Sequence, residues 1–380
     1  MLTNDQEYIL ALLRAALASK TVDISPENND NVIRIIYAHD ILLTVYPYVT
    51  PSLREKLRID AYGMTGHTIK QNYEADIILQ ALAHAGMRCV PLKGLEQGKL
   101  YPIGILRQMA DLDILVRPYD YKSVKSVMES LGFKAEGESS WMHDNFMKGP
   151  ITVEMHKRLT DDSGAVRAWE NRMLERTSKD ENGIYHMTLE DQMIFHIVHM
   201  HKDFLNGSLG LRRIVDIWLL LKQKMDCELV KKEMDLIGLS SFYERMQKLA
   251  HVCMGECLMD EDMELLLKHA FQYGIYGSQK TYQMGRIVAM SNGKGFWKGE
   301  ISSLAAAVFL PASRMKVHFP TVEKYPILLP YFWMKRIINF LKGDVRQLRQ
   351  KLDYSHLSEK DYEEMQRFFR AGGCRTDLRL

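Results

Sequence analysis

Residues 106–116, LRQMADLDILV, decide the fold because they place two acidic residues at the start of an apolar strand. Side chains two positions apart in a strand point to the same face, so Asp111 and Asp113 would stand side by side. Neighbouring carboxylates repel each other and raise each other's pKa unless a cation lies between them. The pair therefore predicts half of a divalent-metal site. The alternative interpretation is a helix N-cap or a turn, because aspartate is common in both.

Further short β-rich runs surround this strand. Residues 87–94, MRCVPLKG, precede it, and the amphipathic helix pattern SVKSVMESLG follows at 123–132, closed by Gly132. Three more runs, FKAEG (133–137), WMHDNFMKG (141–149) and ITVEMHKRL (151–159), are separated by turn residues and predict strands that pair as a meander. This order of strands and helices predicts a small mixed sheet covered by helices.

Helical periodicity dominates on both sides of this region. Residues 4–85 show apolar side chains at three- and four-residue spacing, including a long helix that ends before Gly86. The helical period returns from residue 189 onward, and SNGKGFWKGE at 291–300 reads as a loop or linker. We therefore predict an α+β protein with four regions: helices in 1–85, the sheet core in 86–160, helices that complete a cleft in 161–290, and a helical tail in 291–380.

Composition excludes several classes of protein. A chain of 380 residues suggests two or three packed units, and 46% hydrophobic with 26% charged residues is ordinary for a globular protein. The net charge of +2 gives no sign of a nucleic-acid partner, which a strongly basic domain or stripe usually signals, so no nucleic acid is expected, although a local basic patch is compatible with this total. Five scattered cysteines without a secretory leader favour a cytoplasmic location.

No apolar run is long enough to predict a transmembrane helix. The best candidate, residues 325–341, is interrupted by Pro326, Pro330, Lys335 and Arg336. We interpret it as a core or interdomain helix, with a helix lying on a membrane surface as the alternative.

A third acid completes the predicted metal site. Glu154 lies in an otherwise apolar, β-branched strand about forty residues after Asp113, which is enough chain for a helix and a return to the same sheet. Three carboxylates from neighbouring strands can hold one or two Mg²⁺ ions, which also coordinate waters and substrate phosphates. His156 shares the face of Glu154, so it is a candidate for orienting the ligands or for acid–base work, and a buried structural histidine is the alternative.

Basic residues lie upstream of the acids. Lys93 and Gly94 end the first strand where a helix would begin, so Gly94 permits close backbone approach and Lys93 attracts phosphate. Arg107 supplies a second cation for a triphosphate. Each has a plainer interpretation: Lys93 as a solvated surface charge and Arg107 as a salt-bridge partner.

Together these residues resemble a known family. The run VPLKGLEQGKLYPIGILRQMADLDILV, followed by a helix ending LGF and then VEMHKRL, is similar to bacterial nucleotidyltransferase-family proteins of the DNA polymerase β superfamily. The resemblance covers roughly residues 80–225. It implies a nucleotidyltransferase-type sheet with Asp111, Asp113 and Glu154 as metal ligands, and with Lys93, Gly94 and Arg107 on the nucleotide phosphates. It also implies that histidines of the cluster His196, His199 and His201 line the cleft, together with Arg212 and Asp216.

The function implied is Mg²⁺-dependent transfer of a nucleoside monophosphate group from an NTP to an unidentified acceptor, either a small molecule or a protein. ATP is the expected NTP. Two other functions stay open. One is a noncatalytic nucleotide-binding or regulatory module, and the other is a protein-adenylylating partner of the toxin–antitoxin type. A zinc site in the histidine cluster is a further alternative, since residues three apart share a helix face.

Overall fold

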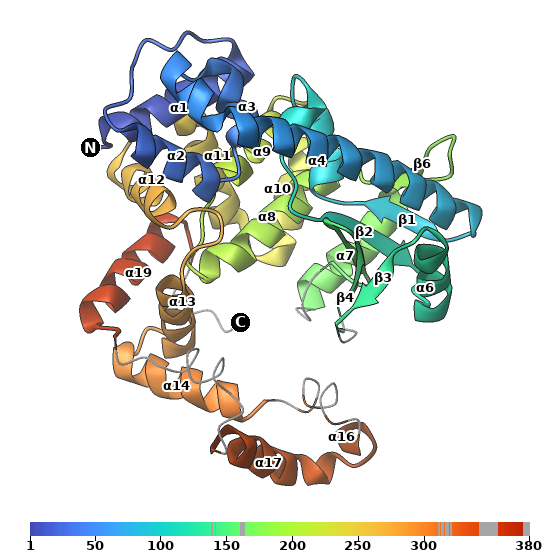
Figure 1. Cartoon of the computed structure of the whole chain (residues 1–380). Helices are drawn as coiled ribbons and strands as arrows, with labels where there is room; N and C mark the ends of the chain where they lie inside the picture. The colour runs from blue at the N-terminus through green and yellow to red at the C-terminus, as the bar shows by residue number, and fades with distance from the viewer. Residues whose placement is uncertain are drawn as a thin grey trace. The chain divides into compact units, whose positions relative to one another are not determined.

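Helices precede and follow a five-stranded mixed sheet in the computed structural model (Figure 1), which confirms the predicted α+β class. The structure describes residues 1–137, 140, 142–159, 164–310, 312, 315, 319, 321–341 and 356–374. Parts of the predicted C-terminal tail, 342–355 and 375–380, therefore lie outside the described residues, and so does Trp141 of the predicted meander.

The sheet has the strand order β1-β2-β5-β4-β3. Strands β2 and β5 run parallel and all other neighbours pair antiparallel, so the predicted meander of the last three strands is confirmed. Helix α6 (Tyr121–Ser130) provides the return from β2, and the Gly149–Pro150 turn joins β4 to β5. The strands are β1 (Arg88–Pro91), β2 (Leu112–Arg117), β3 (Lys134–Glu136), β4 (His143–Lys148) and β5 (Ile151–His156).

The two faces of the sheet have different chemistry. Leu112, Ile114 and Val116 of β2 point into a hydrophobic core with Val153 and Met155 of β5. Helix α6 and the long helix α4 (Pro51–His84) contribute to the same core and cover this face. Because side chains alternate along a strand, the residues between them point to the opposite face, which carries the acids.

The N-terminal helices form largely as their sequence pattern predicts. Thr3 closes a capping box on α1 with Gln6, and Pro51 occupies the first turn of α4, where its missing N–H costs nothing. Leu53, Leu57 and Ala61 recur every four residues along the buried side of α4. The other elements before it are α1 (Asn4–Ala18), α2 (Asn29–Ala38), α3 (Leu42–Val45) and the 3₁₀ turn η1 (Tyr46–Tyr48).

Short elements connect β1 to β2, and helices dominate after the sheet. Between the two strands lie α5 (Gly94–Gln97), η2 (Gly98–Leu100) and η3 (Gly104–Leu106). After the sheet follow α7 (Gly164–Arg176), β6 (Ser178–Lys179), β7 (Tyr185–His186), α8 (Leu189–Leu205), α9 (Leu211–Leu221), α10 (Cys227–Ile237), α11 (Ser240–Cys253) and α12 (Glu261–Tyr273).

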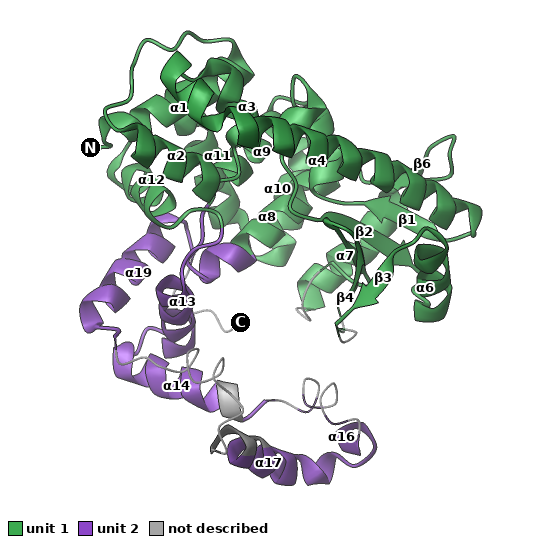
Figure 2. Cartoon of the chain, in the orientation of Figure 1, with its two compact units in different colours: residues 1–201, 210–275 green, residues 202–209, 276–380 purple. Residues whose placement is uncertain are grey.

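The chain divides into two units (Figure 2). Unit 1 comprises residues 1–201 and 210–275, and unit 2 comprises 202–209 and 276–380. The sheet and all the candidate site residues belong to unit 1. The four regions expected from the sequence are finer than this division, and their boundaries stay a prediction.

Unit 2 corrects one expectation from the sequence. Residues 291–300 do not form a loop throughout, because α14 already begins at Phe296. Gly293 and Gly295 both adopt positive φ and confine the turn to the residues between the two helices. The helices of this unit are α13 (Gln279–Ser291), α14 (Phe296–Val308), α16 (Thr321–Lys324), η4 (Pro326–Leu328), α17 (Leu329–Leu341) and α19 (Glu359–Ala371).

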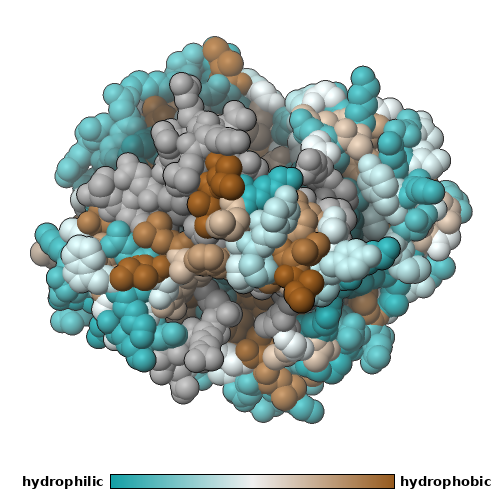
Figure 3. All heavy atoms as spheres, turned by 90° about the horizontal axis from the view of Figure 1, so that it is seen from below, coloured by the Kyte–Doolittle hydropathy of each residue, from teal (hydrophilic) through white to brown (hydrophobic). Residues whose placement is uncertain are grey.

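Several large apolar side chains of unit 2 are exposed, among them Trp297, Ile301, Ile327, Tyr331 and Met334. Figure 3 shows hydrophobic residues as separate groups among hydrophilic ones on the face that it views. Within the described residues, no helix combines the length and the apolar character that crossing a membrane requires.

Candidate functional site

Two neighbouring parallel strands bring the predicted acids together. Asp113 on β2 is in register with Glu154 on β5, and Asp111 is the residue immediately before β2. All three belong to the sheet face opposite the hydrophobic core. One carboxylate oxygen from each of the three lies within 4.8 Å of the others, a separation that a shared cation can bridge.

Two basic groups meet Asp113 in this cluster. The Lys93 ammonium and His156 Nε2 each lie 2.7 Å from the same oxygen, Asp113 Oδ1. His156 Nε2 also lies 3.3 Å from Glu154 Oε2 and therefore joins two of the three acids. The Asp113 side chain is almost fully buried, so these contacts act in surroundings that screen charge weakly.

The three carboxyl groups have different affinities for protons. Burial, together with the charge of Asp113, raises the pKa of Asp111 to about 6. Burial alone would raise the pKa of Asp113 as well, but Lys93 and His156 hold it well below its usual range. The hydrogen bond from His156 lowers the pKa of Glu154. Although burial opposes its charged form, the bonds to Asp113 and Glu154 raise the pKa of His156 to about 8.

The donor set fits a hard divalent cation. No described residue donates a hydrogen bond to Asp111, although this carboxylate is partly buried beside Asp113. An oxygen of this carboxylate lies within 4.8 Å of oxygens of two other acids, and a bound cation would stabilise such close like charges. Oxygen ligands from a few carboxylates are those that Mg²⁺ prefers in proteins.

The turn after β1 has an unusual backbone. Lys93 adopts φ 44° and ψ −115°, a conformation that side chains with a Cβ rarely take and that costs on the order of 1–3 kcal/mol. No described residue accepts a hydrogen bond from the amide nitrogens of Lys93 or Gly94. A Cβ on Gly94 would lie 2.5 Å from Met109 Cγ and 2.7 Å from Arg107 Nη1, so only glycine fits there without a shift.

Arg107 is tied to the helical region by a buried ion pair. Its Nε and Nη2 donate to the two oxygens of Asp216 at 2.9 and 2.7 Å, and Nη2 also donates to Gln97 Oε1. Tyr101 donates its hydroxyl to the same aspartate. The side chains of Arg107 and Asp216 are 7% and 0% exposed, so the salt-bridge interpretation of Arg107 is realised. Arg107 Nη1 lies 2.7 Å from the position that a Cβ on Gly94 would occupy.

The contacts of Asp216 and of two α8 histidines are with residues other than the three acids. Asp216 is completely buried against Arg107. His196 contacts Gln97 and the Arg213 carbonyl, and His201 packs edge-on against Phe242. Helical spacing correctly places His196 and His201 on α8, but it cannot show which residues of other elements contact them.

The remaining two residues expected to line the cleft also make contacts outside the acid cluster. His199 Nδ1 lies 3.1 Å from Arg213 Nη1. Arg212 donates to the Gln108 carbonyl and pairs with Asp40. Within the part of the chain that the structure describes, His196, His199 and His201 do not form a metal-binding group.

One residue of the site escaped the sequence prediction. His143 on β4 is in register with His156 on β5, and its Nε2 lies 3.8 Å from Glu154 Oε1. The turn between β4 and β5 could have predicted this position. With Gly149 and Pro150 as the connecting residues, Lys148 pairs with Ile151, and continuing this register along both strands pairs His143 with His156.

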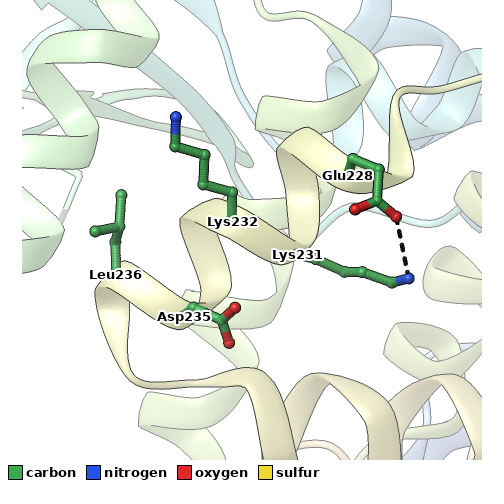
Figure 4. A pocket seen from close by; sticks show the side chains of 5 residues that line it. All are labelled: Glu228, Lys231, Lys232, Asp235 and Leu236. Atoms are coloured by element: carbon green, nitrogen blue, oxygen red, sulfur yellow. Dashed lines mark hydrogen bonds and ion pairs between the residues drawn. The ribbon is translucent and has the colours of Figure 1, made fainter.

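A separate surface pocket takes no part in this cluster (Figure 4). Its lining residues all come from α10: Glu228, Lys231, Lys232, Asp235 and Leu236. Glu228 and Lys231 form an ion pair one helical turn apart. The pocket presents an ordinary solvated helix face.

Comparison with known proteins gives one result. A protein-family model described as an uncharacterised nucleotidyltransferase matches residues 25–255, which include the whole sheet and every residue of the cluster. Searches of curated proteins and of solved structures found no match.

Proposed function

Because this chain belongs to the uncharacterised nucleotidyltransferase family, we propose that it transfers a nucleotide monophosphate from an NTP to an acceptor, with Mg²⁺ as the cofactor. The observation that carries the proposal is the convergence of Asp111, Asp113 and Glu154 on one face of two parallel strands. ATP is the nucleotide that we expect.

The three carboxylates are the proposed metal ligands. Asp111 and Glu154 are partly exposed and flank the buried Asp113, so an ion held by all three would keep an open side for water and for phosphate oxygens. One or two Mg²⁺ ions bound there would offset the charge on the triphosphate and on the departing pyrophosphate.

The turn at Lys93 and Gly94 is the proposed phosphate contact. Its two amides lack acceptors within the described residues, and the absence of a Cβ at Gly94 lets Met109 and Arg107 pack directly against this turn. The Lys93 side chain, on the same turn, is a quarter exposed and adds positive charge. Helix α5 is only one turn long, so backbone amides and Lys93 carry this contact rather than a helix dipole.

Arg107 and His156 have supporting roles in this proposal. Arg107 braces the turn through its pair with Asp216 and presents Nη1 beside Gly94, the one nitrogen left for a phosphate. His156 contacts both Asp113 and Glu154, so it fixes the orientation of two metal ligands.

The acceptor is a small molecule or a protein, and the helices that flank the sheet would determine which. A nucleic-acid acceptor is less favoured because no basic stripe in the sequence accompanies the acids. All five cysteines are free, and we propose a cytoplasmic location. A protein acceptor would make the chain an adenylylating enzyme of the kind found in toxin–antitoxin pairs.

The test is release of pyrophosphate from ATP in the presence of Mg²⁺, measured with pools of hydroxyl-bearing small molecules and with co-purifying proteins. Asp113→Asn should abolish the release while leaving the far-ultraviolet circular dichroism unchanged. Retained turnover in Asp113→Asn would contradict the proposal. Mg²⁺-dependent ATP binding without turnover for any acceptor would favour the noncatalytic nucleotide-binding module.

A further inference from the structure

A second set of donors overlaps the three-acid cluster. One donor atom from each of His143, Glu154 and His156 lies within 4.8 Å of the others. His156 Nε2 is 3.3 Å from Glu154 Oε2, and His143 Nε2 is 3.8 Å from Glu154 Oε1, so the two oxygens of one carboxylate each face an imidazole. Two donors about 2.1 Å from one ion at tetrahedral angles lie about 3.4 Å apart, close to both separations.

Apart from a tilted contact with the ring of His156, no described residue explains the position of the His143 ring. At 3.8 Å its Nε2 is too far from Glu154 for a hydrogen bond. Its Nδ1 is buried and has no partner among the described residues. An imidazole that faces a carboxylate across more than a hydrogen-bond distance leaves room for an ion between the two groups.

The chemistry of this set differs from that of the three acids. Two imidazole nitrogens and one carboxylate favour Mn²⁺, Fe²⁺, Co²⁺ or Zn²⁺ over Mg²⁺, which prefers oxygen. Three protein ligands leave coordination positions open, as in catalytic rather than structural sites. The side chains of His143 and Glu154 are 28% and 24% exposed, which provides a path for entry from solvent.

We propose that His143, Glu154 and His156 form a second metal site, selective for a divalent transition metal, that shares Glu154 with the Mg²⁺ site. The inference deepens the proposed function and rests on it for the role of the shared carboxylate. With an ion on Nε2, His156 exchanges its hydrogen bonds to the acids for a metal bond, while Lys93 stays beside Asp113. The active centre then holds two ions of different chemistry joined by one carboxylate, an arrangement suited to in-line phosphoryl displacement.

The experiment titrates Co²⁺, whose visible absorption reports its ligands, into the full chain after its metals have been removed by chelation. We expect one Co²⁺ with an absorption band that persists in excess Mg²⁺. His143→Ala and the size-conserving His143→Gln should weaken Co²⁺ binding at least about tenfold and remove the band. Asp111→Asn, which alters only the three-acid set, should retain it. His84→Ala, at an exposed histidine of α4, is the matched control.

Two results would overturn the inference: an unchanged Co²⁺ affinity and band in both folded His143 variants, or loss of the wild-type band in excess Mg²⁺, which would mean that Co²⁺ only occupies the carboxylates. A different result would contradict the proposed function and leave the second metal site intact. In that case the His143-dependent band persists but Mg²⁺-dependent NTP binding is absent.

Discussion

Replacing Asp216 by asparagine tests the role assigned to the buried ion pair. The substitution preserves the shape of the side chain but removes its charge. It also replaces one acceptor oxygen by an NH₂ group, which faces an N–H donor of Arg107 and cannot accept its hydrogen bond. Both partners are almost completely excluded from water, and two charge-assisted bonds of 2.9 and 2.7 Å are affected. Tyr101 also loses a charged acceptor.

The burial of the pair determines the expected magnitude. Breaking a buried pair by removing one partner costs about 3–5 kcal/mol, because the other charge stays buried without compensation. An exposed pair contributes only about 0–1 kcal/mol. With side chains 7% and 0% exposed, the Arg107–Asp216 pair belongs to the first class. The matched control is Asp30→Asn, which breaks the exposed pair with Lys56 and should cost less than about 1 kcal/mol.

The assay is urea denaturation followed by tryptophan fluorescence. Trp218 is buried two residues from Asp216 on α9 and contributes to the signal. Each transition is fitted separately because the chain has two units. Asp216→Asn should also weaken nucleotide binding, since Arg107 braces the turn at Gly94. A loss of stability no larger than that of Asp30→Asn would refute the assignment of this pair as a buried brace.

Two further predictions concern single side chains. Gly94→Ala should destabilise the protein by about 1–3 kcal/mol and weaken NTP binding in calorimetry, because the new Cβ collides with Met109 and Arg107. Gly63→Ala, at an open position inside α4, should instead stabilise it by about 0.5–1 kcal/mol, and equal effects of the two would contradict the argument. Burial lowers the pKa of His196 from 6.5 to about 4, so between these values the unfolded chain binds a proton that the folded chain excludes. The Tm advantage of wild type over His196→Gln should therefore shrink as the pH falls from about 6.5 toward 4, and an advantage that grows would show that His196 is protonated in the folded state.

The acids of the site were predictable because strand periodicity carries their geometry. Alternation along β2 places Asp113 on the face away from the core, and a helix with an antiparallel meander returns Glu154 beside it. The long helix α4 was predictable for a similar reason, since its apolar residues recur with the helical period.

The residues around the acids depend on contacts between distant segments. Arg107 and Asp216 are 109 residues apart in the sequence. Neither periodicity nor spacing indicates that their side chains form a buried ion pair. His143 was within reach, because the two-residue turn at Gly149 and Pro150 sets the register of β4. The prediction of a loop over 291–300 was wrong for its second half, because α14 begins at Phe296. The glycines on both sides of Phe296 and Trp297 had favoured a loop in the sequence.

The most direct test of the central claim is isothermal titration calorimetry of each NTP with the full chain, with and without Mg²⁺. We expect at least one NTP to bind only when Mg²⁺ is present. Asp113→Asn and Asp111→Asn should remove this binding, and Asp30→Asn should retain it. Equal binding with and without Mg²⁺, or Mg²⁺-dependent binding that survives both substitutions at the acid cluster, would contradict the claim that these carboxylates hold the metal and the nucleotide.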